Sequence, residues 1–187
     1  MNSEFGQEVV GWTMAFIVAI VMGFLFREYC FELYTVDGPS MLPTLSGGDR
    51  LIVNKIGYNF HEIERGDIVV FRYPREYNTY FVKRIIGIPG DTVEISNGRV
   101  FVNDKELNEF SYTVERPEKG FNREVVPEKS YFVLGDNRNN SEDSRFKDVG
   151  FVNERLVVGK AICIAWPFFH VKKLDLPLSE PLVVLGR

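Results

Sequence analysis

Hydrophobic and polar positions divide the chain into an apolar front segment and a longer part built of short alternating runs. Residues 9–26 read VVGWTMAFIVAIVMGFLF without a charged side chain, and these 18 positions approach the ~20 residues that cross a bilayer as a helix. Trp12 stands near one end of the run, where interfacial aromatic side chains are common. Because the run has no polar face, it predicts a retained membrane anchor and not a helix buried on a small domain.

The flanks of the apolar run bear on its cleavage and its orientation. A cleavable secretory signal begins with basic residues, whereas Glu4 and Glu8 precede this run and Arg27 follows it. Arg27 is also the only positive charge nearby, so the positive-inside rule alone would place the rest of the chain in the cytoplasm.

After residue 36 the pattern changes to short runs of β-branched and aromatic residues separated by turn signals, which predicts a mostly antiparallel β domain. The predicted strands lie at 51–53, 67–73, 80–88, 92–95, 100–102, 130–134 and 157–166. Asn97 and Gly98 accept positive φ and predict a two-residue hairpin. Further turns are expected at 46–49 and 89–91.

Two segments do not follow this pattern. Residues 103–129 are charged, contain Pro117, Gly120 and Pro127, and show no sustained period, so we expect a small peripheral cap insertion there. The final segment, 174–187, is interrupted by prolines and is too short to cross a membrane.

Composition narrows the class of function. A chain of 187 residues with 45 % hydrophobic content can build one domain with a core. The net charge of −4 and the lack of a long basic block argue against a nucleic-acid partner. The two cysteines, Cys30 and Cys163, match neither a CxxC pair nor a zinc site, and two unlinked thiols are the favoured interpretation.

Histidine and metal chemistry have little support. His61 and His170 each stand alone, whereas a Ser-His-Asp triad needs one of them to meet a serine. The sequence holds no HExxH motif or Cys/His cluster, and the acidic loop 136–148 lacks the spacing of a known calcium loop. We therefore expect no metal and no cofactor.

A lysine is the remaining candidate base, because burial can lower its pKa and leave the amine neutral. Strand alternation places Lys83 on the same face as Phe81 and Ile85, an apolar neighbourhood, while Arg84 points to the opposite face. Taken alone, a strand lysine is more often a surface residue that reaches solvent.

The candidate nucleophile is Ser40, which lies shortly after the apolar run. Glycine and two prolines rigidify the segment GPSMLPT at 38–44, and such a turn can expose Oγ and aim backbone N–H groups at an oxyanion. On local composition alone, a proline-rich linker explains the same segment.

The two fragments together resemble type I signal peptidases, membrane-bound Ser-Lys endopeptidases that remove signal peptides from exported preproteins. Four blocks similar to those of the family follow the apolar segment in the same order, at 38–44, 48–55, 80–91 and 135–145. The resemblance covers nearly the whole chain. Its compact length and single anchor are similar to the Gram-positive branch.

The resemblance implies roles for five residues. Ser40 would be the nucleophile and Lys83, as a neutral amine, its general base. Ser141 would orient the Lys83 amine, and Asp143 and Arg145 would form a supporting ion pair.

One position departs from part of the family. Some members carry an oxyanion-stabilising serine where this chain has Gly38. The oxyanion hole would then depend on the Ser40 backbone N–H, with a second backbone donor or a water molecule.

The resemblance also implies a fold, a substrate class and a location. The fold would consist of antiparallel sheets forming a coiled, partly open β-barrel-like catalytic domain over 27–187. Substrates would be preproteins with small residues at −1 and −3, bound in shallow apolar pockets near Ser40. The chain would cross the bacterial cytoplasmic membrane once at 9–26, with 1–8 in the cytoplasm and the catalytic domain outside, against the orientation suggested by Arg27.

Two other functions remain open at this point. One is a non-catalytic, membrane-anchored binding module of the same fold, which the presence of both Ser40 and Lys83 argues against. The other is a self-cleaving repressor-type Ser-Lys protease, which would need a soluble DNA-binding head where this chain has an apolar run.

Overall fold

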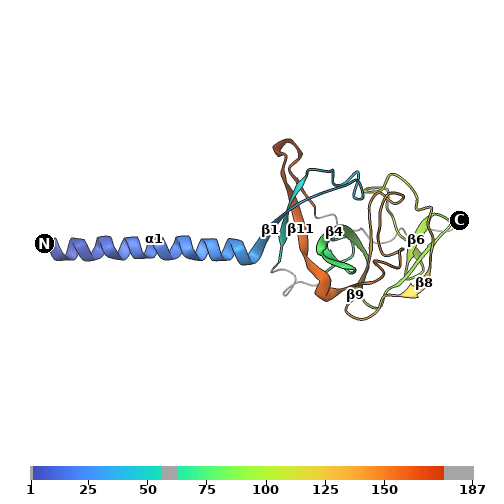
Figure 1. Ribbon diagram of the computed structural model, residues 1–187, viewed down its shortest axis with the longest axis horizontal. Coiled ribbons are helices and arrows are strands. Elements are labelled where there is room, and N and C mark those ends of the chain that lie inside the picture. The colour runs from blue at the N-terminus through green and yellow to red at the C-terminus, as the bar shows by residue number, and fades with distance from the viewer. Residues whose placement is uncertain (1, 56–62, 175–187) are drawn as a thin grey trace.

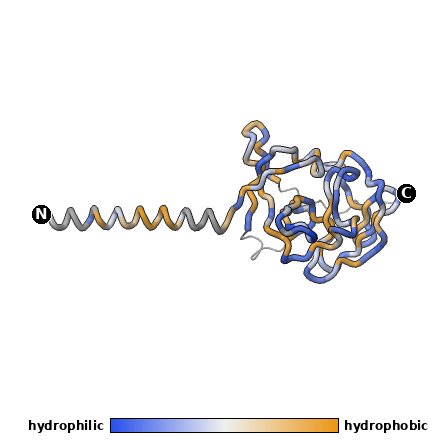
Figure 2. Tube along the Cα trace, in the orientation of Figure 1, coloured by the Kyte–Doolittle hydropathy of each residue, from blue (hydrophilic) through white to orange (hydrophobic). Residues whose placement is uncertain are grey.

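The computed structural model describes residues 2–55 and 63–174, so His61 and the segment 175–187 lie outside it. One long helix, α1 (Asn2–Cys30), leads directly into a β domain and projects away from it (Figure 1). The described apolar side chains between Val10 and Met22 are exposed on this helix. Figure 2 shows that apolar residues occupy much of its middle part. Within the described ranges, no helix has the length and apolar character that crossing a membrane requires.

The larger sheet is antiparallel and carries the residues of greatest interest. Its strand order is β1-β2-β11-β3-β4-β9-β10, with β12 attached to β11. In that order the strands are Phe31–Thr35, Arg50–Asn54, Val157–Trp166, Ile68–Tyr73, Glu76–Gly87, Ser130–Leu134 and Val152–Asn153, and β12 is Lys172–Lys173. Among the described residues the outer strands β1 and β10 do not pair with each other, so the sheet does not close into a barrel.

The smaller sheet lies on the side of the domain away from α1 (Figure 1). Its order is β7-β6-β5-β8, formed by Lys105–Glu106, Arg99–Val102, Thr92–Ser96 and Phe121–Val125. Short 3₁₀ turns, η1 (Glu154–Leu156) and η2 (Phe168–His170), flank β11. The prediction of a mostly antiparallel β domain is confirmed, and each predicted strand overlaps an observed one.

Local turn chemistry explains the best-predicted element. Asn97 and Gly98 have φ values of 51° and 70° and connect β5 to β6, with Ser96 opposite Arg99. A two-residue turn with positive φ at both positions matches the twist of the strands it joins. The predicted hairpin is therefore confirmed.

The segment 103–129 is more integrated than its sequence indicated. It contains β7 and β8, which complete the smaller sheet, and Phe121 packs against Phe132 with ring centroids 4.6 Å apart. Four of the five β8 residues are exposed, so pairing with β5, more than an apolar pattern, fixes this strand. The segment 103–129 therefore forms part of the smaller sheet.

The apolar core holds the segment that carries Ser40. Met41 and Leu45 are fully buried in one cluster with Leu51, Val53 and residues of β3 and β11. Burying side chains of this size contributes about 1.5–3 kcal/mol each. Ser40 is therefore fixed to the sheet by the residues that follow it.

The two cysteines, Cys30 and Cys163, are free thiols, as expected.

Candidate active site

Ser40 lies at the start of a tight turn beyond β1. Gly38 has φ of +84°, a left-handed conformation that favours glycine. The Leu42 backbone N–H donates to Pro39 O at 3.1 Å, and the buried Met41 fixes the far side of the turn. The Ser40 side chain is half-buried, with its hydroxyl at a cleft.

Lys83 reaches the same point from β4. It is only 3 % exposed, and its Nζ lies 2.9 Å from Ser40 Oγ and 3.0 Å from Val82 O. The Phe81 ring centroid is 5.0 Å from the same nitrogen. The fold thus brings together two side chains that are 43 residues apart in sequence.

The surroundings of Lys83 favour the neutral form of its amine more than those of an exposed lysine do. Burial lowers the pKa of its side chain to about 8, because desolvation disfavours the ammonium form. The nearby carboxylates of Asp143, Glu142 and Asp136 act in the opposite direction, so desolvation is the dominant effect.

A cleft of about 320 Å³ opens beside the two side chains. Its walls come from the end of β1 and the segment after it, from β4, and from single residues of β2 and β3. The lining residues are Tyr34, Thr35, Val36, Asp37, Ser40, Leu51, Val70, Thr79, Tyr80, Phe81, Val82, Lys83 and Glu142. An elongated molecule could lie in this cleft with a reacting atom beside Ser40.

The loop after β9 is hydrogen-bonded to the turn that carries Ser40. Asn137 donates from its backbone N–H to Ser40 O at 3.0 Å and from its side-chain amide to Pro39 O at 3.1 Å. A Cβ on Gly135 would lie 2.6 Å from Ser40 O and 2.2 Å from Ser141 Oγ, closer than real Cβ contacts allow. Glycine at 135 is therefore required for this close approach.

The three predicted supporting residues lie in the same loop. Asp143 and Arg145 form a buried bidentate ion pair, with both N–O distances 2.8 Å, and Asp143 also accepts from the Gly135 N–H at 3.1 Å. Ser141 Oγ is buried without a hydrogen-bond partner in the described part of the chain, so it does not bond Lys83. The structure therefore places Ser141 against Gly135 and places the ion pair within the loop, bonded to the Gly135 N–H.

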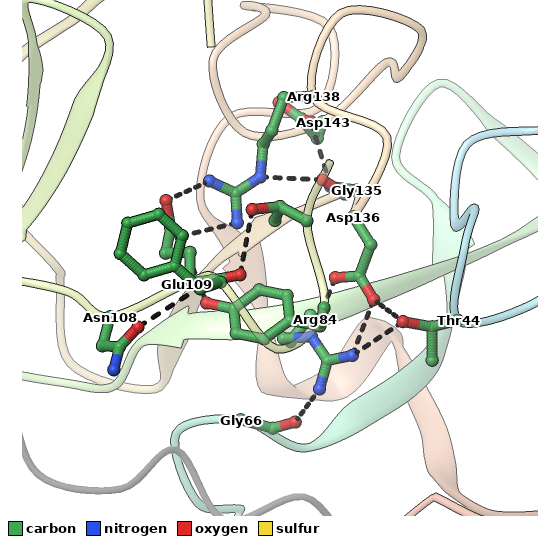
Figure 3. Close-up of polar contacts among 12 residues, drawn as sticks. Thr44, Gly66, Arg84, Asn108, Glu109, Gly135, Asp136, Arg138 and Asp143 are labelled. Carbon is green, nitrogen blue, oxygen red and sulfur yellow. Dashed lines mark hydrogen bonds and ion pairs between the residues drawn. The ribbon is translucent and has the colours of Figure 1, made fainter. Parts of the chain in front are cut away.

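A second buried ion pair was not predicted as part of the site. Arg84 and Asp136 are both completely buried, and Arg84 donates two hydrogen bonds of 2.8 and 2.6 Å to the Asp136 carboxylate (Figure 3). Thr44 Oγ1 donates to the same carboxylate at 2.5 Å, and Arg84 Nη1 donates to Gly66 O at 2.9 Å. The only available signal was that each of these charged residues falls within a family-like block.

The segment 103–129 supplies two residues that contact buried arginines near the site. The Tyr112 ring centroid lies 4.3 Å from the Arg84 guanidinium carbon. Glu109 accepts from Arg138 Nη1 at 2.7 Å, and Arg138 Nε donates to Gly135 O at 3.0 Å (Figure 3). The segment 103–129 is thus tied to the loop that holds Ser40.

Other candidate groups are elsewhere. His170 Nδ1 lies 3.1 Å from Asp49 Oδ1 and does not line the cleft. In the described residues, no group of three or more His, Cys, Asp or Glu side chains is arranged to hold a metal ion. The arrangement that can do chemistry here is a hydroxyl in contact with a buried amine, a nucleophile and base pair suited to acyl transfer.

Comparison with known proteins identifies the family. The model of the family described as signal peptidase, peptidase S26, matches residues 9–166. The chain belongs to this signal peptidase family. It is therefore a serine peptidase of the hydrolase class, as its relatives also indicate.

Relatives of this signal peptidase align along most of their length. Signal peptidase I P of Bacillus subtilis subsp. natto is 38 % identical over 176 residues, which cover 89 % of this chain and 94 % of the relative. Signal peptidase I of Leptolyngbya laminosa is 41 % identical over 170 residues, covering 87 % and 82 %. A crystal structure of a signal peptidase I from Enterococcus faecalis, 35 % identical, covers 53 % of this chain and 96 % of that chain with a TM-score of 0.43.

The buried ion pair leads to a stability prediction. Asp136→Asn leaves the Arg84 guanidinium buried without a counter-charge, and we expect the free energy of unfolding to fall by about 3–5 kcal/mol. Chemical denaturation of the full chain in detergent measures this. Glu106→Gln, which breaks the exposed pair with Arg99, should change it by less than about 1 kcal/mol. Equal losses for the two variants would contradict the assignment.

Proposed function

We propose that this signal peptidase is membrane-anchored and cleaves N-terminal signal peptides from exported preproteins with Ser40 as nucleophile and Lys83 as general base. The 2.9 Å contact between Ser40 Oγ and Lys83 Nζ carries the proposal. The relatives named signal peptidase I support the substrate class. A buried lysine with a lowered pKa has no evident use in a non-catalytic binding module.

In the acylation step, the neutral Lys83 amine takes the Ser40 hydroxyl proton while Oγ attacks the carbonyl carbon of the scissile bond. The resulting tetrahedral intermediate carries an oxyanion. The Lys83 ammonium then donates its proton to the leaving nitrogen, and the C–N bond breaks. The mature protein leaves with a free amine, and the signal peptide remains as an ester on Ser40.

Deacylation repeats the same proton transfers with water. Lys83 takes a proton from a water molecule as its oxygen attacks the ester carbon. When the C–Oγ bond breaks, the proton returns to Ser40 Oγ and the signal peptide leaves as a carboxylic acid. Because Lys83 is the titratable side chain that bonds Ser40 Oγ in the described residues, one lysine would serve both half-reactions.

The oxyanion is assigned to the Ser40 backbone N–H. This amide takes part in no backbone hydrogen bond of the described residues, and Gly38 leaves open space before it. Ser141 is proposed to supply a hydroxyl group to the site. Its buried Oγ packs on Gly135, next to the backbone oxygen of Ser40. Asp143 and Arg145 would hold the loop that carries it.

The substrate would bind as an extended strand. β1 is an outer strand of the larger sheet, and residues 79–82 of β4 form another wall of the cleft, so a peptide could add to an exposed strand edge. Alternate side chains of an extended peptide point in one direction, which would turn the −1 and −3 residues toward the same wall. Val36, Val70 and Leu51 line that cleft, an apolar surface suited to small side chains.

Anchoring is proposed from the front segment. Residues 9–26 carry no charge, and the described apolar side chains of α1 are exposed to the surroundings instead of packed on the domain. α1 leads into β1, which lines the cleft, so a bilayer around α1 would lie close to the site (Figure 1). We place 1–8 in the bacterial cytoplasm and 27–187 outside the cytoplasmic membrane, where preproteins emerge.

The first test removes each member of the dyad. Ser40→Ala and Lys83→Ala should each lower the kcat/KM for a preprotein by at least about 10³-fold, because nucleophile and base act as a unit. Circular dichroism should show both variants folded, and Lys105→Ala on exposed β7 should retain activity. Substantial cleavage by either dyad variant would falsify the assignment.

The second test follows pH. Because the base must be neutral and burial lowers the Lys83 pKa to about 8, kcat/KM should be low in acid and rise tenfold per pH unit until it levels off near pH 8. Initial rates on a peptide without titratable groups measure this limb. A flat profile from about pH 6 to pH 10 would be incompatible with lysine as the base.

The third test concerns anchoring. The full chain should stay with membranes during alkaline carbonate extraction, and Val18→Arg combined with Ala19→Arg should release it, because each central charge costs about 2.5–3.5 kcal/mol in a spanning helix. Val18→Leu combined with Ala19→Leu is the matched control and should stay bound. Extraction of the unmodified chain would refute the anchor.

A further inference from the structure

Glu142 is a carboxylate at the cleft that the proposed mechanism does not use. It lines the same cleft as Ser40 and Lys83 and is exposed to solvent. Tyr73 donates a hydrogen bond of 3.0 Å from its hydroxyl to Glu142 Oε1. The Tyr73 ring in turn stacks on Phe81, with centroids 4.7 Å apart and planes at 25°. An aromatic pair on β3 and β4 therefore fixes where this carboxylate lies.

The negative charge of Glu142 is not neutralised by an ion pair, unlike the charges of the neighbouring carboxylates. Asp143 and Asp136, the other carboxylates close to Lys83, each form a buried ion pair, with Arg145 and Arg84. Glu142 appears in no ion pair of the described residues, and its hydrogen-bond partner Tyr73 is neutral. Its negative charge is therefore available to a molecule in the cleft.

The other residues that line the cleft add to the negative electrostatic potential in it. Apart from Lys83, the charged residues that line the cleft are Asp37 and Glu142, and the rest of the lining is apolar, aromatic or neutral. When Lys83 is neutral, as the base must be, the lining carries two negative charges. A cleft lined by one sign of charge attracts the opposite sign and repels its own.

We propose that Glu142 is a specificity residue that favours substrates with a lysine or arginine side chain close to the scissile bond. The inference rests on the proposed function, because it requires the cleft to hold a peptide beside Ser40. A basic side chain of the bound peptide pairs with the Glu142 carboxylate at the cleft edge, and an acidic side chain there is repelled. For a solvent-exposed pair, the preference should be up to about fivefold in kcat/KM.

The test uses matched peptide substrates that differ at one position. Lysine, alanine or glutamate is placed in turn at positions −5, −4, −2, +1, +2 and +3, while −1 and −3 stay alanine. The lysine-to-alanine ratio of kcat/KM is then measured with the full chain in detergent. The wild type should show a ratio of about three to five at one position. Raising the salt to about 0.5 M should bring that ratio toward one, because exposed charges are screened.

Variants then assign the preference to Glu142. Glu142→Gln should bring the ratio close to one, and Glu142→Lys should make glutamate the preferred residue at the same position. Tyr73→Phe removes the hydroxyl that positions the carboxylate and should lower the ratio without reversing it. Glu128→Gln changes an exposed carboxylate outside the cleft lining and should leave the ratio unchanged.

The outcomes separate this inference from the function it rests on. Efficient cleavage of the alanine peptide with no charge preference at any position overturns the role of Glu142 and leaves the dyad intact. A preference that survives Glu142→Lys also overturns it. If the wild type cleaves none of the peptides and no preprotein, the proposed function fails, and the inference fails with it.

Discussion

The buried ion pair between Arg84 and Asp136 is the constraint on which the site depends. Arg84 follows Lys83 directly on β4, Asp136 follows Gly135 in the loop that clamps Ser40 O, and Thr44 from the nucleophile turn bonds the same carboxylate. One charged contact thus joins the three segments that meet at the dyad. Neither charge could remain buried without the other, so the three segments are held in one arrangement.

Burial of Lys83 supports the proposed chemistry by lowering the pKa of its amine, and it lowers the stability of the folded chain. Its pKa falls from 10.5 to about 8, so the unfolded chain holds the proton more tightly than the folded one. Below pH 8 both states are charged and the folded protein bears the full penalty, on the order of 3 kcal/mol, which disappears as pH rises through about 10.5. The core around Met41 and Leu45 and the paired arginines offset this penalty.

Local sequence patterns predicted the structural features that depend on residues close together in the chain. Alternation along β4 predicted that Lys83 and Arg84 point to opposite faces, and Asn97-Gly98 predicted the β5–β6 hairpin. The pairing of Arg84 with Asp136 was not predicted, because a contact between residues 52 apart leaves no periodic signal. β8 was missed for a related reason: its strand is fixed by pairing with β5, while most of its side chains face solvent.

The central claim is that Ser40 meets a lysine that is neutral when the enzyme works. The direct measurement is a pH titration of the Lys83 side chain by NMR, with ¹³C-labelled lysine and Lys83→Ala to assign the signal. The account predicts one lysine resonance that titrates near pH 8 and is absent from the variant spectrum. If every lysine signal, including that of Lys83, titrates close to the ordinary value of 10.5, Lys83 is not the base and the mechanism is wrong.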